Sequence, residues 1–414
     1  MSQAARSTPR HAAMSQFAVS NGELLVGGTP LCRLAARLGQ TPFYAYDRQL
    51  LNRRVGELRA ALPASLKLHY AMKANPMPAL VCHMAGLVDG IDVASGGELK
   101  VALDAGADAR EVSFAGPGKQ RAELRQAVAA GILINIESFR EVTELATISE
   151  QMGSTARVAV RVNPDFELKS SGMKMGGGAK QFGVDAEQVP ELLAEIGRSG
   201  LAFEGFHLFA GSQNLKAEAI VEAQSKSFEL ACRLAQSAPS PVRFLNLGGG
   251  FGIPYFPGEQ ALDLAPIGAN LAAIADQAAR ELPAAELVVE LGRYLVGEAG
   301  IYVTRVVDRK LSRGHTFLVT DGGLHHHLSA SGNFGQVIRK NYPVAIGNRM
   351  ASSERETVSV VGPLCTPLDL LADRMELASA EAGDLVVIFQ SGAYGFSASP
   401  QAFLGHPACL EVLV

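Results

Sequence analysis

The sequence lacks the features that mark secreted, membrane-spanning and nucleic-acid-binding proteins. Its five cysteines are scattered without pairing or CxxC spacing, which disfavours a disulfide framework and fits a reducing compartment. No apolar run is long enough to span a bilayer. The net charge of −4 gives no basic field for nucleic acid and no polybasic membrane anchor. We therefore predict a cytoplasmic protein that binds neither nucleic acid nor membranes.

The N-terminal residues 1–17 contain two arginines but lack the apolar core of a signal peptide, so they are expected to form a loose tail. The chain has 414 residues, which is too long for one ordinary domain. Its content of 48% hydrophobic and 19% charged residues is a globular balance with ample core. Two domains are therefore expected.

Apolar, strand-like runs alternate with helical stretches over most of the chain, and the pattern repeats eight times. Strands that alternate with helices indicate βαβ units and a parallel sheet. Eight such units have the size of a TIM-like (β/α)8 barrel of roughly 250 residues. A doubly wound open sheet is the alternative. The eight runs are Leu66–Met72, Gly90–Val93, Glu111–Ala115, Ile132–Ile136, Ala156–Val162, Phe203–Phe209, Val242–Leu247 and Ala285–Glu290.

Beyond Arg293 the pattern changes to β-rich runs with little helical periodicity, which predicts a second, all-β domain. The connecting stretch Leu328–Arg355 is rich in Gly, Ser and Asn and is expected to be a long loop. The β-rich runs are Leu295–Asp308, His315–Thr320, Glu356–Val361 and Asp384–Gln390.

Lys73 ends the first barrel strand, because the run LKLHYAMKANP alternates and then stops at Pro76. Active sites of barrel enzymes lie at the C-terminal ends of the strands. Burial among apolar neighbours would depress the pKa of a lysine, and a neutral amine can form a Schiff base with a carbonyl. The alternative is a lysine at a strand end with its ammonium in water.

Two more strand ends carry chemistry. The run Gly248–Gly252 follows a strand directly, and its backbone amides would cradle a phosphate, with hydroxyl donors from Ser212 and Tyr394. The spacing is neither G-x-G-x-x-G nor a Walker loop, and a flexible turn is the alternative. Glu290 ends the last strand, where a carboxylate would keep a ring nitrogen protonated. A structural ion pair with Arg293 is the alternative.

Cys365 lies in a loop rich in glycine and proline, where a thiol could deliver a proton, although an inert thiol is the usual case. Three consecutive histidines, His325 to His327, cannot easily converge on one ion, so no metal is predicted. A lysine, a phosphate cradle and a carboxylate for a ring nitrogen together describe a site for pyridoxal 5′-phosphate (PLP).

From about Thr41 to the C-terminus the sequence resembles the fold-type III PLP-dependent decarboxylases, which include diaminopimelate and ornithine decarboxylases. The motifs that carry the resemblance are HYAMKANP, DVASGGEL, INIES, RVNP, GFHLFAGSQ, LNLGGGFGIPY, ELGR, VVGPLCTPLD and SGAYG. The resemblance implies a homodimer with shared active sites. It also implies three parts: residues 1–42 as a tail and a strand that joins the β-domain, residues 43–297 as the PLP-binding barrel, and residues 298–414 as the C-terminal β-domain.

The resemblance also implies residue roles. Lys73 would bind PLP covalently, and Cys365 would return a proton from the other subunit after carbon dioxide leaves. Thr366 and Asp369 would lie at the substrate. The remaining cofactor contacts would come from Asp92, Glu98, Arg161, Phe209, Ser212, Gly249, Gly250, Glu290, Gly292, Arg293 and Tyr394.

Three positions depart from the family pattern. Phe209 replaces the histidine of HIGSQ that stacks on the cofactor ring; it can stack, but it cannot share a proton. Thr366 replaces the carboxylate that reads the distal amine of a diamino acid. A buried ammonium without a partner is costly, so a free diamino acid is disfavoured. Leu291 replaces the proline of EPGR, which is a mild change.

These departures, with the segments Ser171–Gly183 and Asp321–Gly323, resemble a narrower group. That group comprises decarboxylases of exosortase-type systems and those that act on an aminoacyl group held on an acyl carrier protein. We therefore predict α-decarboxylation of a carrier-bound, glutamyl-type group. The alternatives are a free diamino-acid decarboxylase such as diaminopimelate decarboxylase, a PLP-dependent racemase, and a non-catalytic PLP-binding protein.

Overall fold

The computed structural model describes residues 10–167, 173–174, 176–334, 336 and 338–414. Residues Ser171, Gly172 and Met175 of the predicted subgroup segment lie outside the described residues, as does most of the N-terminal tail. The chain divides into two compact units. One comprises Asn52–Gly252 and Leu262–Leu295; the other comprises Met1–Leu51, Ile253–Ala261 and Val296–Val414.

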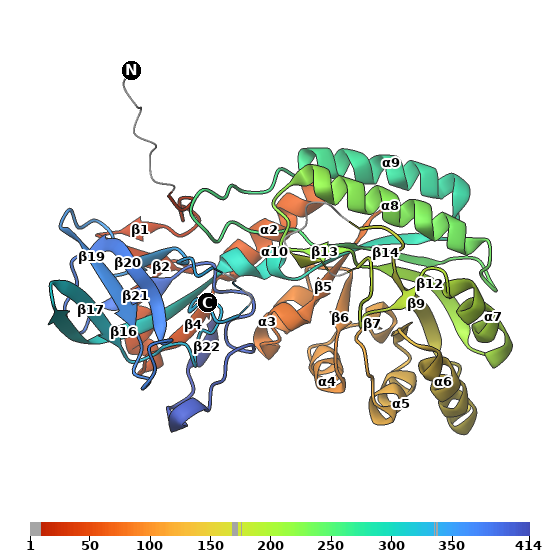
Figure 1. Cartoon of the computed structure of the whole chain (residues 1–414), viewed down its shortest axis with the longest axis horizontal. Helices are drawn as coiled ribbons and strands as arrows, with labels where there is room; N and C mark the ends of the chain where they lie inside the picture. The colour runs from red at the N-terminus through yellow and green to blue at the C-terminus, as the bar shows by residue number, and fades with distance from the viewer. Residues whose placement is uncertain (1–9, 168–172, 175, 335, 337) are drawn as a thin grey trace, which may run out of the picture. The chain divides into compact units, whose positions relative to one another are not determined.

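The first unit is a closed barrel of eight parallel strands, which confirms the predicted fold (Figure 1). Pairing of β8 with β9 and of β15 with β5 closes the sheet, so the doubly wound alternative is wrong. The barrel strands are β5 (Lys67–Ala71), β6 (Gly90–Val93), β7 (Val112–Phe114), β8 (Leu133–Ile136), β9 (Arg157–Asn163), β12 (Ala202–Leu208), β14 (Phe244–Gly249) and β15 (Glu286–Leu291).

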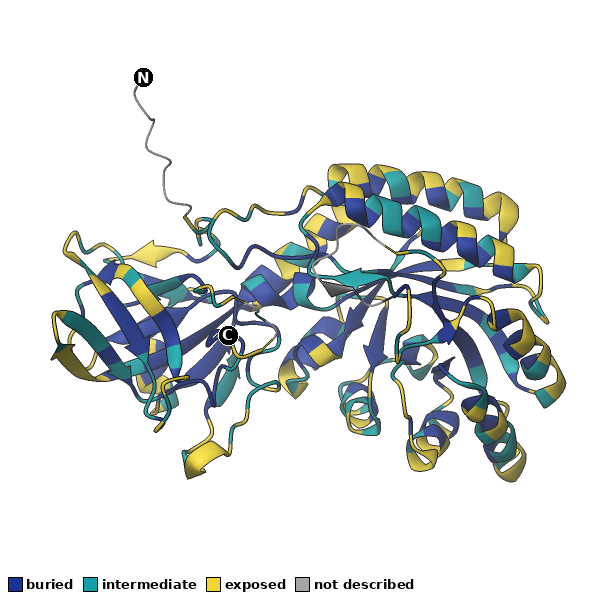
Figure 2. Ribbon diagram, viewed as in Figure 1, coloured by how far each residue is buried: buried dark blue, intermediate teal, exposed yellow. Residues whose placement is uncertain are grey.

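Helices surround the barrel, with buried inner and exposed outer faces (Figure 2). On α5 (Arg121–Ala130), for example, Leu124, Ala127 and Val128 are buried. Local signals set the ends of α5: Gln120 and Glu123 form a capping box, and Gly131 ends the helix in the left-handed conformation. The other helices of this unit are α3 (Pro78–Ala85), α4 (Gly96–Asp104), α6 (Phe139–Met152), α7 (Val189–Ser199), α8 (Ala217–Ala235) and α9 (Ala265–Glu281); α2 (Arg48–Ala61) begins in the other unit.

The second unit is mostly β-sheet, as predicted. Its central strand β16 (Gly300–Ser312) begins later than the predicted Leu295, because residues 293–299 form the helical turns α10 (Arg293–Val296) and η3 (Gly297–Ala299). The sequence pattern missed β18, β20 and β22. The other strands of this sheet are β4 (Phe43–Tyr46), β17 (His315–Thr320), β18 (Val344–Ile346), β19 (Arg355–Val361), β20 (Leu370–Ala378), β21 (Leu385–Ile388) and β22 (Leu410–Leu413).

The N-terminal segment contributes α1 (Leu31–Leu38), which ends at Gly39 in the left-handed conformation, and a small sheet of its own. That sheet consists of β1 (Val19–Ser20), β2 (Glu23–Val26) and β3 (Thr29–Pro30), while β4 pairs with β16 and β22. Among the described residues, no helix combines the length and the apolar character needed to cross a bilayer.

Candidate active site in the barrel

Lys73 lies just beyond the C-terminal end of β5, in η1 (Met72–Ala74), which is one turn of 3-10 helix. The turn is fixed locally: the amide of Asn75 donates to Met72 O at 3.0 Å, and the hydroxyl of Tyr70 donates to Asn75 O at 2.7 Å. The Lys73 side chain is 43% exposed. The expectation of a lysine buried among apolar side chains is therefore wrong, because the turn carries the side chain outward from the strand.

Glu290, near the end of β15, is the buried counterpart of this lysine. Its Oε1 lies 3.9 Å from Lys73 Nζ, and its Oε2 lies 3.1 Å from His207 Nε2. The side-chain amide of Asn246 donates to Oε2 at 3.3 Å. Burial alone would raise the pKa of Glu290, but the contact with His207 and the charge of Lys73 lower that pKa to about 2. The carboxylate is thus charged although the protein surrounds it.

His207 and Asn246 are neighbours of the site that the sequence reasoning missed. Both are polar residues, one in β12 and one in β14, and both are buried. Their positions follow the alternation of a strand, in which every second side chain faces the barrel interior. A polar residue on the inward face of a buried strand is the signal that could have identified them.

Phe209 lies directly after β12, next to the lysine. The Lys73 ammonium is 5.4 Å from the centroid of its ring, within the range of a cation–π contact. The rings of Phe209 and His207 meet edge to face, with centroids 6.5 Å apart. The phenyl ring therefore lies beside the lysine, as a residue that stacks on a ring bound there would.

Asp92 and Glu98 belong to β6 and to the first turn of α4. Asp92 is buried and accepts a hydrogen bond from the hydroxyl of Ser113 at 2.5 Å, and its Oδ1 lies 3.1 Å from His69 Nδ1. Glu98 caps its own helix by accepting from the amide of Ala94 at 2.7 Å. Burial raises the pKa of Glu98, against the lowering effects of that amide and of the Lys73 charge.

Arg161, on β9, is buried and paired. Its guanidinium donates to Glu137 Oε1 at 2.9 Å and lies 4.9 Å from the Phe182 ring centroid. Glu137 also accepts from the amides of Gly116 and Gly183. Burial would raise the pKa of Glu137, but Arg161 and Lys119 lower it. Glu137 thus joins three strand-end loops around Arg161.

The predicted phosphate cradle lies at the ends of β14 and β15. Gly249 is the last residue of β14, and Gly250 follows with φ 75°, a left-handed conformation that glycine adopts without strain. A Cβ at Gly292 would lie 2.9 Å from both Ala71 O and Ala74 Cβ, so only glycine lets the end of β15 approach the turn that carries Lys73. Arg293 follows Gly292, and Ser212 ends the short strand β13 (Gly211–Ser212).

The remaining predicted site residues belong to the β-rich unit. Cys365 is exposed, and the neighbouring Thr366 hydroxyl accepts from the amide of Leu368 at 3.3 Å. Asp369 is only 3% exposed, and its carboxylate accepts from the amides of Leu324 and Leu364 at 2.6 and 2.8 Å. Burial raises the pKa of Asp369, against the effect of these two amides. The carboxylate of Asp369 thereby holds the loop that carries Cys365.

Tyr394, also in the β-rich unit, has a left-handed backbone with φ 53°, and the hydroxyl of Ser329 donates to its carbonyl at 2.8 Å. The rings of the consecutive His325 and His326 lie 3.7 Å apart, centroid to centroid, while His326 and His327 contact different partners. His326 Nε2 lies 2.8 Å from Pro407 O, and His327 Nε2 lies 2.8 Å from the Ser391 hydroxyl. Burial lowers the pKa of His325 to about 3, so its ring is neutral.

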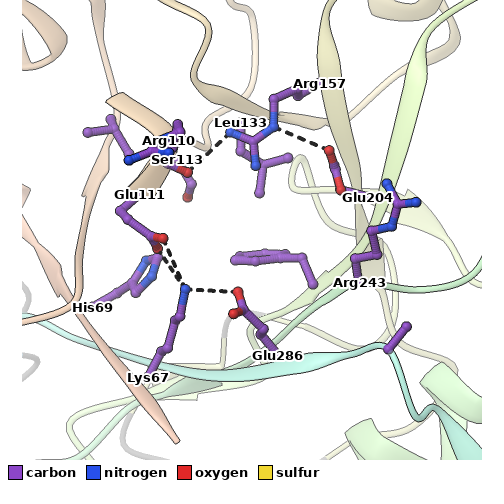
Figure 3. Close-up of a pocket in the computed structure, with 13 residues that line it drawn as sticks. Lys67, His69, Arg110, Glu111, Ser113, Leu133, Arg157, Glu204, Arg243 and Glu286 are labelled. Atoms are coloured by element: carbon purple, nitrogen blue, oxygen red, sulfur yellow. Dashed lines mark hydrogen bonds and ion pairs between the residues drawn. The ribbon is translucent and has the colours of Figure 1, made fainter. Parts of the chain in front are cut away.

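The opposite, N-terminal mouth of the barrel holds a cavity of about 380 Å³ (Figure 3). Lys67 lies between two carboxylates there, 3.0 Å from Glu111 and 2.8 Å from Glu286. Arg157 pairs with Glu204 at 3.2 Å. These ion pairs join the strand starts to one another, which is the role expected of this face in a barrel.

The groups at the C-terminal end of the barrel fit PLP by their chemistry. An amine, Lys73, and a charged buried carboxylate, Glu290, occur together at these strand ends, and they are the two groups that the aldehyde and the protonated ring nitrogen of PLP require. The glycine turn after β14 offers backbone amides to a phosphate, with the Ser212 hydroxyl and the Arg293 guanidinium as further donors.

Comparison with known proteins points in the same direction. Residues 48–297 match the family model described as the pyridoxal binding domain of pyridoxal-dependent decarboxylases. The chain is 38% identical to the L-glutamyl-[BtrI acyl-carrier protein] decarboxylase of Niallia circulans, over 90% of this chain and 89% of that protein. It is 33% identical to the diaminopimelate decarboxylase of Aquifex aeolicus, over 95% and 91%. The crystal structure of the M. jannaschii diaminopimelate decarboxylase with L-lysine superposes with a TM-score of 0.88 at 25% identity, covering 96% of this chain and 92% of that one.

Proposed function

Because the chain belongs to the pyridoxal-dependent decarboxylase family, we propose that it releases the α-carboxylate of an aminoacyl group held on an acyl carrier protein, with a glutamyl-type group as the first candidate. The family makes the chain a PLP-dependent carboxy-lyase. The identity of the substrate is the part that we propose.

One observation carries this choice of substrate. The loop Gly362–Asp369 contains a single carboxylate, Asp369, and both of its oxygens accept backbone amides in a buried position. If a diamino acid placed its distal ammonium at Thr366, the ammonium would therefore contact a hydroxyl, and this loop would offer it no free carboxylate. Since an ammonium without a partner is costly to bury, a free diamino acid is disfavoured.

The relatives support the same choice. The relative that acts on a carrier-bound L-glutamyl group is 38% identical to the chain, compared with 33% for the diaminopimelate decarboxylase of Aquifex aeolicus. Diaminopimelate decarboxylation is the second candidate, because several decarboxylases of that name share 30% or more of their residues with the chain.

The barrel residues have the following proposed roles. Lys73 would hold the cofactor by its aldehyde carbon, and Glu290 would keep the ring nitrogen protonated. When bound, PLP supplies an electron sink for the carbanion that loss of carbon dioxide leaves. The charged state of Glu290 favours decarboxylation over racemisation, because a protonated ring draws electrons more strongly. The phosphate would be held by Ser212, Gly249, Gly250, Gly292, Arg293 and Tyr394.

The remaining roles concern order and protonation. Phe209 would stack on the ring, and Asp92, Glu98 and Arg161 would order the surroundings of the lysine and the ring. Cys365 would return a proton to Cα, reaching into the site of a second subunit in a homodimer. Thr366 would contact the substrate. For Asp369, its two backbone partners favour a positioning role for the loop over direct substrate contact.

Mass spectrometry of the PLP-loaded protein with two substrate pools tests the proposal. One pool holds free meso-diaminopimelate, ornithine, lysine and arginine; the other holds L-glutamyl and other aminoacyl thioesters of a holo acyl carrier protein. We expect a loss of carbon dioxide only in the carrier pool, and none with Lys73→Ala. Decarboxylation of a free diamino acid would overturn the carrier assignment, and a D-amino acid without carbon dioxide release would overturn decarboxylation.

A further inference from the structure

A groove in the β-rich unit concentrates positive charge on a chain that is acidic as a whole. It encloses about 1150 Å³ between the N-terminal segment, the loop before β18 and strands β19 and β20. Five cationic side chains line it: Arg10, Arg339, Lys340, Arg355 and Arg374.

Among the described residues, two carboxylates, Asp373 and Glu376, line the same groove, so three positive charges remain in excess there. The whole chain has a net charge of −4. A local excess of this kind, in a concave surface, focuses a positive potential that attracts an anionic partner.

Arg339 is fixed in the groove without being neutralised by its hydrogen bonds. Its guanidinium donates to Ser331 O at 3.1 Å, Asn341 Oδ1 at 2.8 Å and Leu370 O at 2.8 Å. All three acceptors are uncharged oxygens. The side chain is therefore held in one orientation while it keeps its full charge.

The other cations keep their charged ends at the surface. Lys340 and Arg374 are exposed, and the Lys340 ammonium lies 5.5 Å from the Phe256 ring centroid, a contact that leaves the charge in place. Arg355 pairs with Glu376 at 3.3 Å, but both side chains are about half exposed or more, at 48% and 70%. An exposed pair of this kind is weak and can be exchanged for another anion.

We propose that this groove receives the acidic surface of the acyl carrier protein and the phosphate of its phosphopantetheine arm. The inference rests on the proposed function and adds the place where the carrier binds. Acyl carrier proteins are acidic as a class, and the arm is attached through a phosphodiester, which arginine and lysine bind well. A second copy of this chain is a poorer occupant, because a two-fold interface would bring like charges together.

The test uses one acyl group on three supports: L-glutamyl-BtrI carrier protein, L-glutamyl-phosphopantetheine and L-glutamyl-pantetheine. The PLP-loaded enzyme is compared with Lys340→Glu/Arg374→Glu and with Arg125→Glu, a control that reverses an exposed cation on α5.

We expect the double variant to raise KM for the carrier substrate at least about tenfold, with kcat unchanged. For the pantetheine substrate, kcat/KM should stay within about twofold, because rim charges act only on a charged partner. A loss shared by the phosphopantetheine substrate would assign part of the effect to the phosphate.

Four further results would decide against the groove. They are an equal KM for wild type and double variant on the carrier, an equal loss on all three substrates, the same loss in Arg125→Glu, and a change of oligomeric state in sedimentation of the double variant. The last result would make the groove a subunit contact. Failure of the proposed function would give a different result, because the wild type would then release no carbon dioxide from any of the three thioesters.

Discussion

At the scale of single residues, the neighbours of Glu290 decide its charge. Burial opposes ionisation, yet His207 at 3.1 Å and Lys73 at 3.9 Å lower the pKa of this carboxyl to about 2. A carboxylate that stays charged inside a protein suits a partner that must remain protonated, as a pyridine nitrogen must for decarboxylation. Two predictions follow from this arrangement.

The first concerns acid stability. The folded pKa of Glu290, about 2, lies below its ordinary value of 4.5, so ionised Glu290 stabilises the fold above pH 4.5, and this contribution is lost as the pH falls towards 2. We expect Glu290→Gln to destabilise the protein by about 1–3 kcal/mol near neutral pH. In thermal unfolding between pH 7 and 2, the Tm difference from wild type should narrow below pH 4.5. Glu286→Gln, on the same strand, serves as the control and should change the Tm far less than Glu290→Gln near neutral pH, because it removes only an ion pair whose carboxylate is 59% exposed.

The second prediction concerns His207. His207→Phe removes the partner of Glu290 and keeps an aromatic ring of similar size, so the carboxylate becomes easier to protonate. We expect His207→Phe to lower kcat/KM by about 10- to 100-fold and to make PLP dissociate more readily. His207→Gln should retain part of the activity and part of the affinity for PLP. Cofactor absorbance and dissociation during dialysis provide the measurement. Wild-type affinity and spectrum in both variants would contradict a role for His207 in setting this charge.

At the scale of elements, the barrel brings the ends of β5 and β15 into close contact through Gly292. A Cβ there would meet Ala71 O and Ala74 Cβ, which flank the lysine turn. Since both neighbours are short and one is backbone, the turn itself must shift to make room. The position of Lys73 relative to Glu290 therefore depends on a residue without a side chain.

Gly292→Ala should accordingly cost about 1–3 kcal/mol of stability and reduce kcat more than substrate binding. The matched control is Gly56→Ala in the middle of α2, where an added Cβ meets nothing within 4 Å. That change should stabilise the protein by about 0.5–1 kcal/mol, because alanine favours the helix. Urea unfolding and steady-state kinetics measure both effects, and similar behaviour of the two variants would refute the close-contact argument.

At the scale of the whole molecule, the proposed homodimer divides the chemistry between subunits. If Cys365 acts in the site of the partner subunit, Lys73→Ala and Cys365→Ala damage different halves of each site. A mixed dimer then holds one intact site and one doubly damaged site.

Mixing the two inactive variants after dissociation and reassociation should therefore restore about a quarter of wild-type activity, because half of the dimers are mixed and each has one working site. Carbon dioxide release before and after mixing is the measurement, with each variant incubated alone as the control. A mixture that stays inactive, although sedimentation shows that subunits have exchanged, would mean that each site is built within one chain.

The sequence by itself predicted the barrel strands, most of the other elements and the strand ends that form the candidate site. Alternation and helical periodicity are local properties, so the eight strands, helices such as α5 and the location of Lys73 at a strand end could be predicted within a few residues. The glycine run and Glu290 followed from the same reasoning, since the ends of parallel strands meet at one face. Strand β20 was missed, because its central Asp373 and Arg374 hide the pattern.

Only the tertiary structure decided the properties that depend on neighbours distant in sequence. Three such properties bring together segments that are far apart in the chain. They are the pairing of β8 with β9, which closes the barrel, the contacts of Glu290 with His207 and Asn246, and the hydrogen bonds from two backbone amides to Asp369. The exposure of Lys73 also contradicted an inference from its apolar neighbours in sequence. The burial and the pKa of a side chain depend on all the groups that surround it in space. The pattern of residues along the sequence does not show which groups these are.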